Sequence, residues 1–557
     1  MLRLRNLRIG ALALGVLLLG ACSDDGTGPS PLGVPSGVSA PTTTQTSITL
    51  QWNAATGATG YVIERASAGV SYAQVGTATT PTFTDNGLSP DTEYRYRVLA
   101  TRGSDRSAAS TELIARTGAP GAQVAVIDAD ITANRTLYAD TVYTLRGFIH
   151  VTNNATLTIQ PGTTILGDYN TLGSSLFIMR GAKIDARGTA AEPIVFTSSQ
   201  PESQRRPGDW GGLILVGNAV INRSDVYIEG TGTNETTNPR VYYSGGTDDA
   251  DNSGWLQYVR VEFAGYATAA DQELNSFTFA AVGSGTTLDH LQSLAGLDDS
   301  FEWFGGTVDA THLVSYESGD DHFDMSEGYS GRLQYLIAYQ SKVLVPRTGA
   351  GGTSSDPQGI ENDGCAGAGC GNGQLSQPYT LPVVANFTLI GTGPGHVDAT
   401  SGGVGAVLRR GTGGYYVNGV IARWPKGALS IRDTVNTNQR IRAGELVLQN
   451  VYLTDNGGIT FQTGTDRTVL DLAANSLVAG AVGSASLFNS LPTDPSSEAQ
   501  FDWLPAVGSP IRTGGMNAFA GALAARAGTF VTPTAYVGAA DPDGARWWEG
   551  WTNYADN

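Results

Sequence analysis

The sequence predicts an all-β protein in two parts, a small antiparallel sandwich followed by a much longer parallel β-helix. Three observations predict this fold class. Only 15% of the 557 residues are charged, against roughly a quarter in typical soluble domains. Glycine contributes 73 residues, and Thr, Ser, Ala and Val are abundant among the rest, a mixture that favours short strands joined by tight turns. Alternating apolar and polar runs fill residues 34–117, and short related strands recur from residue 122 onwards.

Residues 1–22 have the organisation of a secretory signal. Three arginines within the first eight residues precede an apolar run at residues 11–19, which is too short to span the ~30 Å hydrocarbon core of a bilayer. The run ends in Leu19-Gly20-Ala21-Cys22. This ending resembles a bacterial lipobox, and the resemblance implies cleavage before Cys22 and a lipid on its sulfur. An ordinary signal peptide with an incidental cysteine is the alternative.

The residues after Cys22 bear on location and partners. Ser23 stands where an inner-membrane retention signal has Asp, so we expect a secreted, lipid-anchored protein at the outer membrane or cell surface. Residues 23–33 are polar and contain Gly and Pro, which is typical of a flexible tether. The chain carries 33 basic against 51 acidic residues, a net charge of -18. We therefore expect a membrane contact through the lipid and no nucleic-acid partner.

The two other cysteines are close together in a Gly-rich segment. Cys365 and Cys370 are five residues apart. Outside the cytoplasm two such thiols are expected to pair, so the sequence predicts a disulfide that closes a small loop. A metal site built on the two cysteines is the alternative, but no histidine stands beside them.

Residues 34–117 contain alternating strands separated by Pro, Gly and Asn, which predicts an antiparallel sandwich. Trp52 lies in the second predicted strand, and residues 88–94, ending at Tyr94, follow the pattern L-x-P-x-T-x-Y. The segment resembles a fibronectin type III domain. The resemblance implies a buried Trp52 and a corner tyrosine at Tyr94, both structural, so we expect a spacer or a weak binding module.

Residues 122–500 repeat short strand motifs, among them residues 256–263 and 333–339, at spacings of roughly 20 to 32 residues. Three strands and three turns fit that length, which predicts a right-handed parallel β-helix whose strands pair one coil away at about 4.8 Å. A β-propeller with four strands per blade is the alternative. The segment resembles the pectate-lyase-like superfamily and secreted bacterial β-helix lipoproteins. Residues 501–557, with a predicted helix at 516–526 and a Trp-rich tail, are expected to cap the last coil.

The pattern D-D-x-F-(D/E) occurs twice, at residues 298–302 and 320–324, one predicted coil apart. Two unit charges about 5 Å apart repel by ~3 kcal/mol at an effective dielectric constant of 20, so a cation, proton uptake or arginine must relieve a stacked arrangement. Ca²⁺ prefers such hard oxygen ligands. Asp-rich turns whose side chains point in different directions are the alternative. The candidate ligands are Asp298, Asp299, Glu302, Asp320, Asp321 and Asp324, with Asp248, Asp249, Asp251, Glu361 and Asp363 as further candidates from neighbouring turns.

The same pair of segments resembles the N-T-D and G-D-D motifs of polygalacturonases. The resemblance implies that Asp299, Asp320 and Asp321 are the carboxylates of an inverting hydrolase. The family's G-H-G is replaced by Gly328-Tyr329-Ser330-Gly331, with a distant His396, and its R-I-K has only a loose counterpart near Arg432. These departures weigh against that activity.

Three histidines, His290, His312 and His322, lie on consecutive predicted coils. We assign them different strand positions, which argues against a zinc triad.

Together these features predict an extracellular binding or adhesion lipoprotein that engages a glycan or another surface ligand along the β-helix, with bound calcium as a possible cofactor. The alternative function is a polysaccharide-degrading enzyme, either a hydrolase of the polygalacturonase type or a lyase, that uses the stacked Asp cluster. A third hypothesis is that the protein is a purely structural element of the cell surface.

Overall fold

The computed structural model describes residues 31–43, 46–67, 71–117, 123–393, 403–457, 460–461 and 477–554. The chain forms two compact units, residues 1–121 and 122–557. The predicted signal, Cys22, most of the tether and His396 lie outside the described residues. Among the described helices, none combines the length and the apolar character needed to cross a bilayer.

The first unit is an antiparallel sandwich of two sheets. Trp52 is buried with its ring centroid 5.1 Å from that of Tyr61, in an edge-to-face contact. The Tyr94 hydroxyl accepts a hydrogen bond from the Ser89 N–H at 2.9 Å, which is the corner contact that the resemblance implies. One sheet has the order β1-β2-β5, and the other the order β4-β3-β6-β7 with β8 beside β6. The strands are β1 (Ser36–Thr43), β2 (Ser47–Asn53), β3 (Gly60–Ser67), β4 (Ala73–Ala78), β5 (Thr82–Asn86), β6 (Glu93–Arg102), β7 (Asp105–Arg106) and β8 (Leu113–Arg116).

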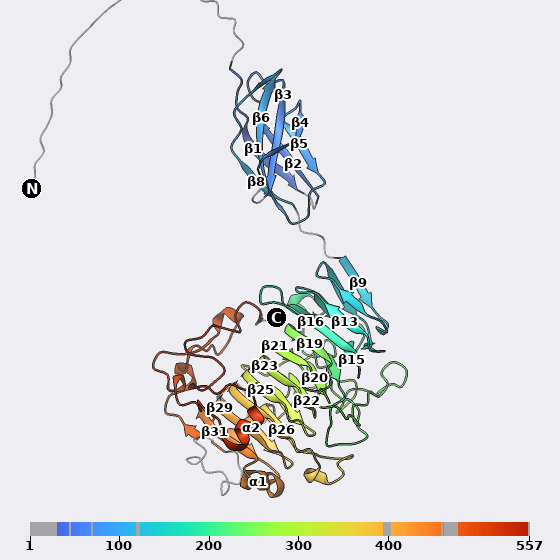
Figure 1. Cartoon of the computed structure of the whole chain (residues 1–557), viewed down its shortest axis with the longest axis vertical. Helices are drawn as coiled ribbons and strands as arrows, with labels where there is room; N and C mark the ends of the chain where they lie inside the picture. The colour runs from blue at the N-terminus through green and yellow to red at the C-terminus, as the bar shows by residue number, and fades with distance from the viewer. Residues whose placement is uncertain are drawn as a thin grey trace, which may run out of the picture. The chain divides into compact units, whose positions relative to one another are not determined.

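The second unit is a parallel β-helix (Figure 1). Its 15-stranded sheet contains β9 (Gln123–Ile127), β10 (Arg135–Leu137), β11 (Thr141–Leu145), β13 (Thr156–Ile159), β14 (Thr164–Gly167), β16 (Lys183–Arg187), β17 (Ile194–Ser198), β19 (Gly254–Glu262), β21 (Thr287–Gly296), β23 (Asp309–Ser318), β25 (Arg332–Tyr339), β27 (Val383–Ile390), β29 (Gly414–Ala422), β31 (Leu446–Thr454) and β32 (Leu477–Ala479). Its nine-stranded sheet contains β12 (Phe148–Val151), β15 (Ser175–Ile178), β18 (Leu213–Val216), β20 (Phe277–Ala280), β22 (Phe301–Phe304), β24 (Phe323–Ser326), β26 (Gln358–Asp363), β28 (Val404–Arg409) and β30 (Gly427–Ile431).

The remaining elements are short. A hairpin pairs β33 (Phe488–Ser490) with β34 (Asp502–Pro505). The α-helices are α1 (Thr434–Arg442) and α2 (Gly521–Ala527), and the 3₁₀ helices are η1 (Glu202–Gln204), η2 (Gly373–Leu375), η3 (Ser484–Ser486), η4 (Glu498–Gln500) and η5 (Pro510–Arg512). The sequence therefore predicted α2 over too long a range and missed α1.

From β19 onwards, two strands of each coil fuse into one long bent strand. The first half of β19 pairs with β16, and its second half pairs with β17. Between the halves, Tyr258 adopts a left-handed backbone with φ 49°. The following coils repeat this bend at the equivalent residue, and Asn and His are among the residues that tolerate such a backbone best. We call the stacked bend residues the corner column: Tyr258, His290, His312, Tyr335, Asn386, Asn418 and Asn450.

The interior of the β-helix stacks like residues on like. The rings of Phe277 and Phe301 lie 4.9 Å apart, those of Phe301 and Phe323 lie 5.5 Å apart, and all three are fully buried. Parallel pairing aligns Phe301 with Phe323 directly. The 22-residue offset of the acidic repeat is thus one coil, as the sequence predicts.

Residues 487–554, here called the C-terminal strap, lie along the side of the β-helix, whereas we expected 501–557 to cover its last coil. Hydrogen bonds tie the strap to coils from Asn450, which donates to Gly514 O at 2.7 Å, back to Arg260, which donates to Trp551 O at 2.9 Å. The strap takes this path because it binds the outer face of the long bent strands. Amide side chains on this face donate hydrogen bonds to the strap backbone, and the strap buries the apolar side chains of the same face. The strap therefore acts as a lateral cover.

The corner column offers a matched test of this cover. Asn418 is fully buried and exchanges hydrogen bonds with Met516 and Thr534 of the strap, whereas Asn450 makes one, to Gly514. Both have left-handed backbones, so Ala costs each the same strain. We expect Asn418→Ala to lower the free energy of unfolding by about 2 kcal/mol more than Asn450→Ala, at about 1 kcal/mol per hydrogen bond. Equal losses in urea denaturation would contradict the role given to the strap.

Candidate functional site

The acidic repeat forms a row of carboxylates on the outer face of the nine-stranded sheet. Glu302 on β22 pairs in register with Asp324 on β24, and Asp324 pairs with Glu361 on β26. Because side chains alternate along a strand, the neighbouring Phe301 and Phe323 point into the core and the three carboxylates point out.

The turns before these strands add the other four predicted carboxylates. Asp299 Oδ1 accepts a hydrogen bond from the Asp321 N–H at 2.8 Å, and Asp321 Oδ1 accepts one from the Gln358 N–H. Asp298 and Asp320 belong to the same cluster, with oxygens within 4.8 Å of one from Asp299. The structure thus brings all six residues of the acidic repeat together on one side of the β-helix.

Eleven acidic side chains and Arg409 line a cleft of about 410 Å³, which we call the acidic cleft. Four of these carboxylates were not predicted from the sequence, because they lie on segments without the coil repeat, and Glu361 was predicted only as a further ligand. Asp248, Asp249 and Asp251 are not part of the described lining; Asp249, for example, accepts a hydrogen bond from the Val220 N–H. The carboxylates of the cleft are Glu229, Asp271, Glu273, Asp298, Asp299, Glu302, Asp320, Asp321, Asp324, Asp356 and Glu361.

Burial and mutual repulsion disfavour ionisation in the acidic cleft. Burial is the larger cause, and it raises the pKa of Asp298, Asp299, Glu302, Asp321 and Asp324 well above the usual range. Neighbouring carboxylates raise these pKa values further. The same causes, again with burial first, raise the pKa of Asp320 to about 6, of Glu229 to about 7 and of Glu361 to about 8.

The cation in the described lining of the cleft, Arg409, already forms ion pairs with carboxylates. Arg409 donates to Glu361 and, from Nε at 2.8 Å, to Asp363, which also accepts from Arg410. An elimination reaction needs a basic group that can take a proton from the substrate. The described lining of the acidic cleft offers no uncommitted Arg or Lys for that step.

The donor set suits a hard divalent cation. Three groups of carboxylate oxygens lie within 4.8 Å of one another, namely Asp298–Asp299–Asp320, Asp299–Glu302–Asp324 and Asp321–Asp324–Glu361. Asp324 Oδ1 is buried and has no hydrogen-bond partner among the described residues, a costly state for a carboxylate oxygen. Several carboxylate oxygens around one point are the ligands that Ca²⁺ prefers.

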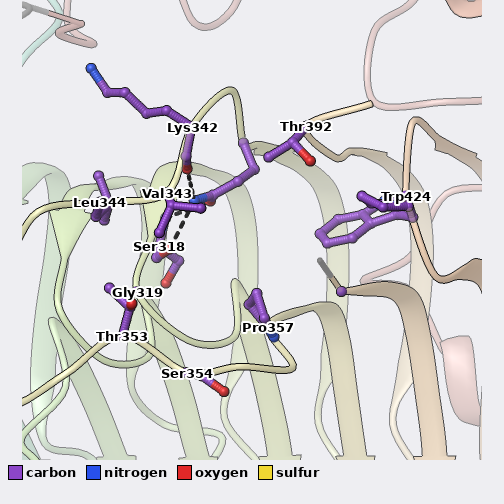
Figure 2. A pocket seen from close by; sticks show the side chains of 13 residues that line it. Ser318, Gly319, Lys342, Val343, Leu344, Thr353, Ser354, Pro357, Thr392 and Trp424 are labelled. Carbon is purple, nitrogen blue, oxygen red and sulfur yellow. Dashed lines mark hydrogen bonds between the residues drawn. The ribbon is translucent and has the colours of Figure 1, made fainter. Parts of the chain in front are cut away.

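A much smaller pocket, of about 20 Å³, adjoins the acidic cleft and shares Ser354 with it. Figure 2 shows Trp424 and Pro357 on its walls, while the amine of Lys342 points away from it. Trp424 is only 2% exposed, so its ring gives this pocket an apolar wall and not an open stacking platform.

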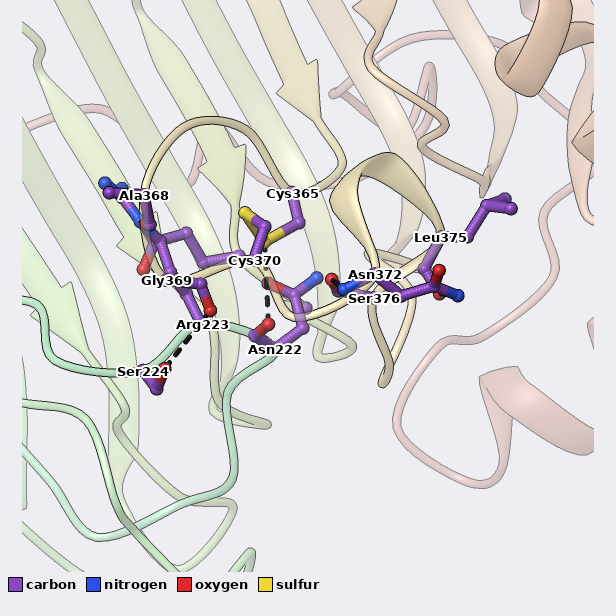
Figure 3. Close-up of a disulfide and its surroundings, with 12 residues drawn as sticks. Asn222, Arg223, Ser224, Cys365, Ala368, Gly369, Cys370, Asn372, Leu375 and Ser376 are labelled. Atoms are coloured by element: carbon purple, nitrogen blue, oxygen red, sulfur yellow. Dashed lines mark hydrogen bonds and ion pairs between the residues drawn. A yellow bond between two sulfur atoms is a disulfide. The ribbon is translucent and has the colours of Figure 1, made fainter.

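Cys365 and Cys370 form a disulfide that closes a surface loop (Figure 3). Arg223 Nε donates to Ala368 O at 2.6 Å, and the Ser224 N–H donates to Gly369 O at 3.1 Å. The closed loop therefore clamps the segment between β18 and β19 onto the coil that carries Glu361.

The positions of the histidines differ from those expected from the sequence. His290 and His312 occupy equivalent positions of the corner column, so assigning them different strand positions was wrong. His322 is buried elsewhere, with Nδ1 2.6 Å from Ser315 Oγ.

The raised pKa values of the acidic cleft predict how stability depends on pH when no cation is bound. The folded-state pKa values lie above the ordinary values of 3.8 for Asp and 4.5 for Glu, so folding favours the protonated forms. This contribution to stability is complete below the ordinary values and is lost as pH rises through about 6 to 8. With a chelator present, we expect the melting temperature to fall between pH 5 and pH 8, and excess Ca²⁺ to abolish the fall.

Two variants sharpen this measurement. Asp324→Asn keeps the shape and removes one charge, and it should stabilise the chelated protein at pH 8 by roughly 1 kcal/mol or more. Asp185→Asn, at an exposed carboxylate paired with Arg187, should have little effect. A chelated protein equally stable at pH 5 and pH 8 would show that the carboxylates of the cleft do not repel one another as described.

Comparison with known proteins agrees with the two-part architecture. The pectate-lyase-like β-helix domain family matches residues 129–486, and the fibronectin type III domain family matches residues 33–115. Exoglucanase B of Cellulomonas fimi is 30% identical over 242 residues, which are 42% of this chain and 19% of that protein. The chain therefore spans about a fifth of the length of this curated relative.

Solved structures similar to part of the chain include fibronectin type III domains. The domain from human collagen alpha-1(XX) is 26% identical with a TM-score of 0.16, and covers 17% of this chain and 95% of that chain. An Fn3-like protein from Clostridium thermocellum is 30% identical with a TM-score of 0.14, and covers 16% of this chain and 92% of that chain. Since the first family matches residues 129–486, more than half of the sequence, the protein belongs to the pectate-lyase-like β-helix domain family and carries a fibronectin type III domain before it.

Proposed function

We propose that the protein binds an extracellular glycan at the acidic cleft in a calcium-dependent manner. The observation that carries this proposal is the convergence of eleven carboxylates on one cleft, whose described lining contains one arginine, already paired with carboxylates. Such a cleft repels an anionic ligand until cations neutralise it. Bound Ca²⁺ supplies that neutralisation and leaves coordination positions that sugar hydroxyl or carboxylate oxygens can take.

The family membership and the exoglucanase relative support a carbohydrate as the ligand. Fold alone does not determine function, so the proposal depends on the chemistry of the cleft. Asp299, Glu302 and Asp324 would hold the cation, since their carboxylate oxygens together form one of the three close groups and two of these residues also belong to a second group. The fibronectin type III domain serves as a spacer.

Calorimetry tests this function. We expect purified protein to bind Ca²⁺, and Asp299→Asn or Asp324→Asn to weaken that binding by roughly tenfold or more, because affinity follows the charge of the ligand set. Asp185→Asn is the matched control, with an exposed carboxylate outside the cleft. A glycan array probed with and without Ca²⁺ then identifies the ligand. Unaltered Ca²⁺ affinity in both cleft variants, or the absence of any glycan bound with Ca²⁺, would reject the proposal.

A second candidate is a polysaccharide hydrolase that uses Asp299, Asp320 and Asp321. The observation that favours it is the raised pKa of Asp320, about 6, which suits a general acid near neutral pH. For this activity we expect release of reducing ends from the bound glycan and a loss of about 100-fold or more in Asp320→Asn. Binding without release of reducing ends identifies a binding protein.

We also propose that a lipid on Cys22 anchors the protein at the outer membrane or cell surface. The lipobox-like sequence and the polar residues after it support this location. Labelled palmitate should enter the wild-type protein, and Cys22→Ser should abolish both the labelling and recovery in the membrane fraction. Membrane recovery that persists in Cys22→Ser would rule out this anchor.

A further inference from the structure

A second cluster of metal-ligating side chains lies on the other long sheet, at the corner column. Asp289 Oδ1 is 2.7 Å from His290 Nδ1 and 3.0 Å from His312 Nδ1. The three ligand atoms all lie within 4.8 Å of one another. None of these residues lines the acidic cleft, so whatever this cluster binds is independent of the proposed calcium site.

The fold holds the cluster together. His290 and His312 occupy the same position of successive coils, and their rings stack with centroids 4.3 Å apart. Tyr258 stacks on the outer face of His290 at 4.4 Å, and Tyr335 on the outer face of His312 at 5.0 Å. The two imidazoles are therefore sandwiched between aromatic rings, which limits their rotation and keeps both Nδ1 atoms directed at one carboxylate.

A hydrogen bond to its second oxygen also orients the carboxylate of Asp289. Gln257, one coil before Asp289, donates from Nε2 to Asp289 Oδ2 at 3.1 Å. This contact leaves Oδ1 to face the two imidazoles. In metal sites of proteins, the ligand residues typically make such hydrogen bonds through the atoms that do not bind the metal, and these bonds fix the direction of the atom that does.

We propose that Asp289, His290 and His312 bind a divalent transition-metal ion of the zinc class. Two imidazole nitrogens and one carboxylate oxygen form the donor set that such ions prefer, while Ca²⁺ prefers oxygen alone. Bonds of 2.0–2.2 Å in tetrahedral geometry separate ligand atoms by about 3.4 Å. The oxygen therefore has to move away from each nitrogen by roughly half an ångström as the ion replaces the imidazole protons.

Access and remaining coordination are compatible with an ion. The side chains of His290, His312 and Asp289 are 12%, 24% and 22% exposed, so an ion can enter and water can complete its coordination. Trp547 of the C-terminal strap packs edge-on against both imidazoles, at 6.1 and 5.0 Å. The site thus lies at the contact between the strap and the coils.

The chain supplies its own controls. His150 Nδ1 lies 3.0 Å from Asp130 Oδ1 with a side chain 14% exposed, which reproduces one His–Asp contact of the cluster without the second histidine. Asn occupies the corner column at Asn386, Asn418 and Asn450. His312→Asn therefore places at this corner a residue that the fold already accepts, and it removes a nitrogen ligand.

Zn²⁺ titration of the chelator-stripped full chain tests the site, with Ca²⁺ in excess to occupy the oxygen ligands of the cleft. We expect one Zn²⁺ per chain in the wild type and in His150→Gln. His312→Asn should lose this binding, and Gln257→Ala should weaken it by roughly tenfold. Zn²⁺ binding that is unchanged in His312→Asn would overturn the proposal.

A second measurement does not depend on any variant. With Cu²⁺ in place of Zn²⁺, the electron paramagnetic resonance spectrum of the wild type should show coupling to two imidazole nitrogens. A spectrum with oxygen ligands alone, or no stoichiometric binding of Zn²⁺ or Cu²⁺, would show that the histidine pair only fills the corner column.

Discussion

The parallel pairing of each strand with its counterpart one coil away is the constraint on which the rest of this structure depends. It places equivalent residues of successive coils on top of one another at about 4.8 Å. Inside the β-helix this spacing suits aromatic rings, and Phe277, Phe301 and Phe323 form a buried stack. Outside, the same spacing brings Glu302 next to Asp324, where stacking costs free energy instead of releasing it.

That cost links the fold to its proposed chemistry. A packed core and a backbone ladder hold the carboxylates of the acidic cleft in place, so the side chains cannot separate to relieve repulsion. The remaining relief comes from protons, from Arg409 and from added cations. Arg409 forms ion pairs with Glu361 and Asp363, and its charge also offsets part of the rise that burial causes in the pKa of the nearby Asp324. Within the described residues Asp324 Oδ1 still has no hydrogen-bond partner. A cleft of this kind is suited to respond to divalent ions and to a ligand that arrives with them.

The sequence was informative where the coil repeat is regular. An offset of 22 residues between two acidic segments was enough to predict that Asp299 and Asp321 lie on the same side of the β-helix. It was uninformative where the chain leaves the repeat, because Glu229 and Asp271 come from irregular segments with no period to place them. The equal offset of His290 and His312 was visible, but recognising their shared corner required knowing that two strands fuse into one bent strand there. The path of the C-terminal strap depends on distant amide side chains such as Asn418, which no local pattern marks.

Anomalous diffraction from crystals soaked in Tb³⁺, a calcium substitute with a strong signal, would locate the proposed cation site among the stacked carboxylates. We expect an ordered Tb³⁺ peak among the oxygens of Asp299, Glu302 and Asp324, and we expect added Ca²⁺ to displace it. Crystals in which the acidic cleft contains only water, or in which the ion sits elsewhere on the coils, would contradict the proposed site.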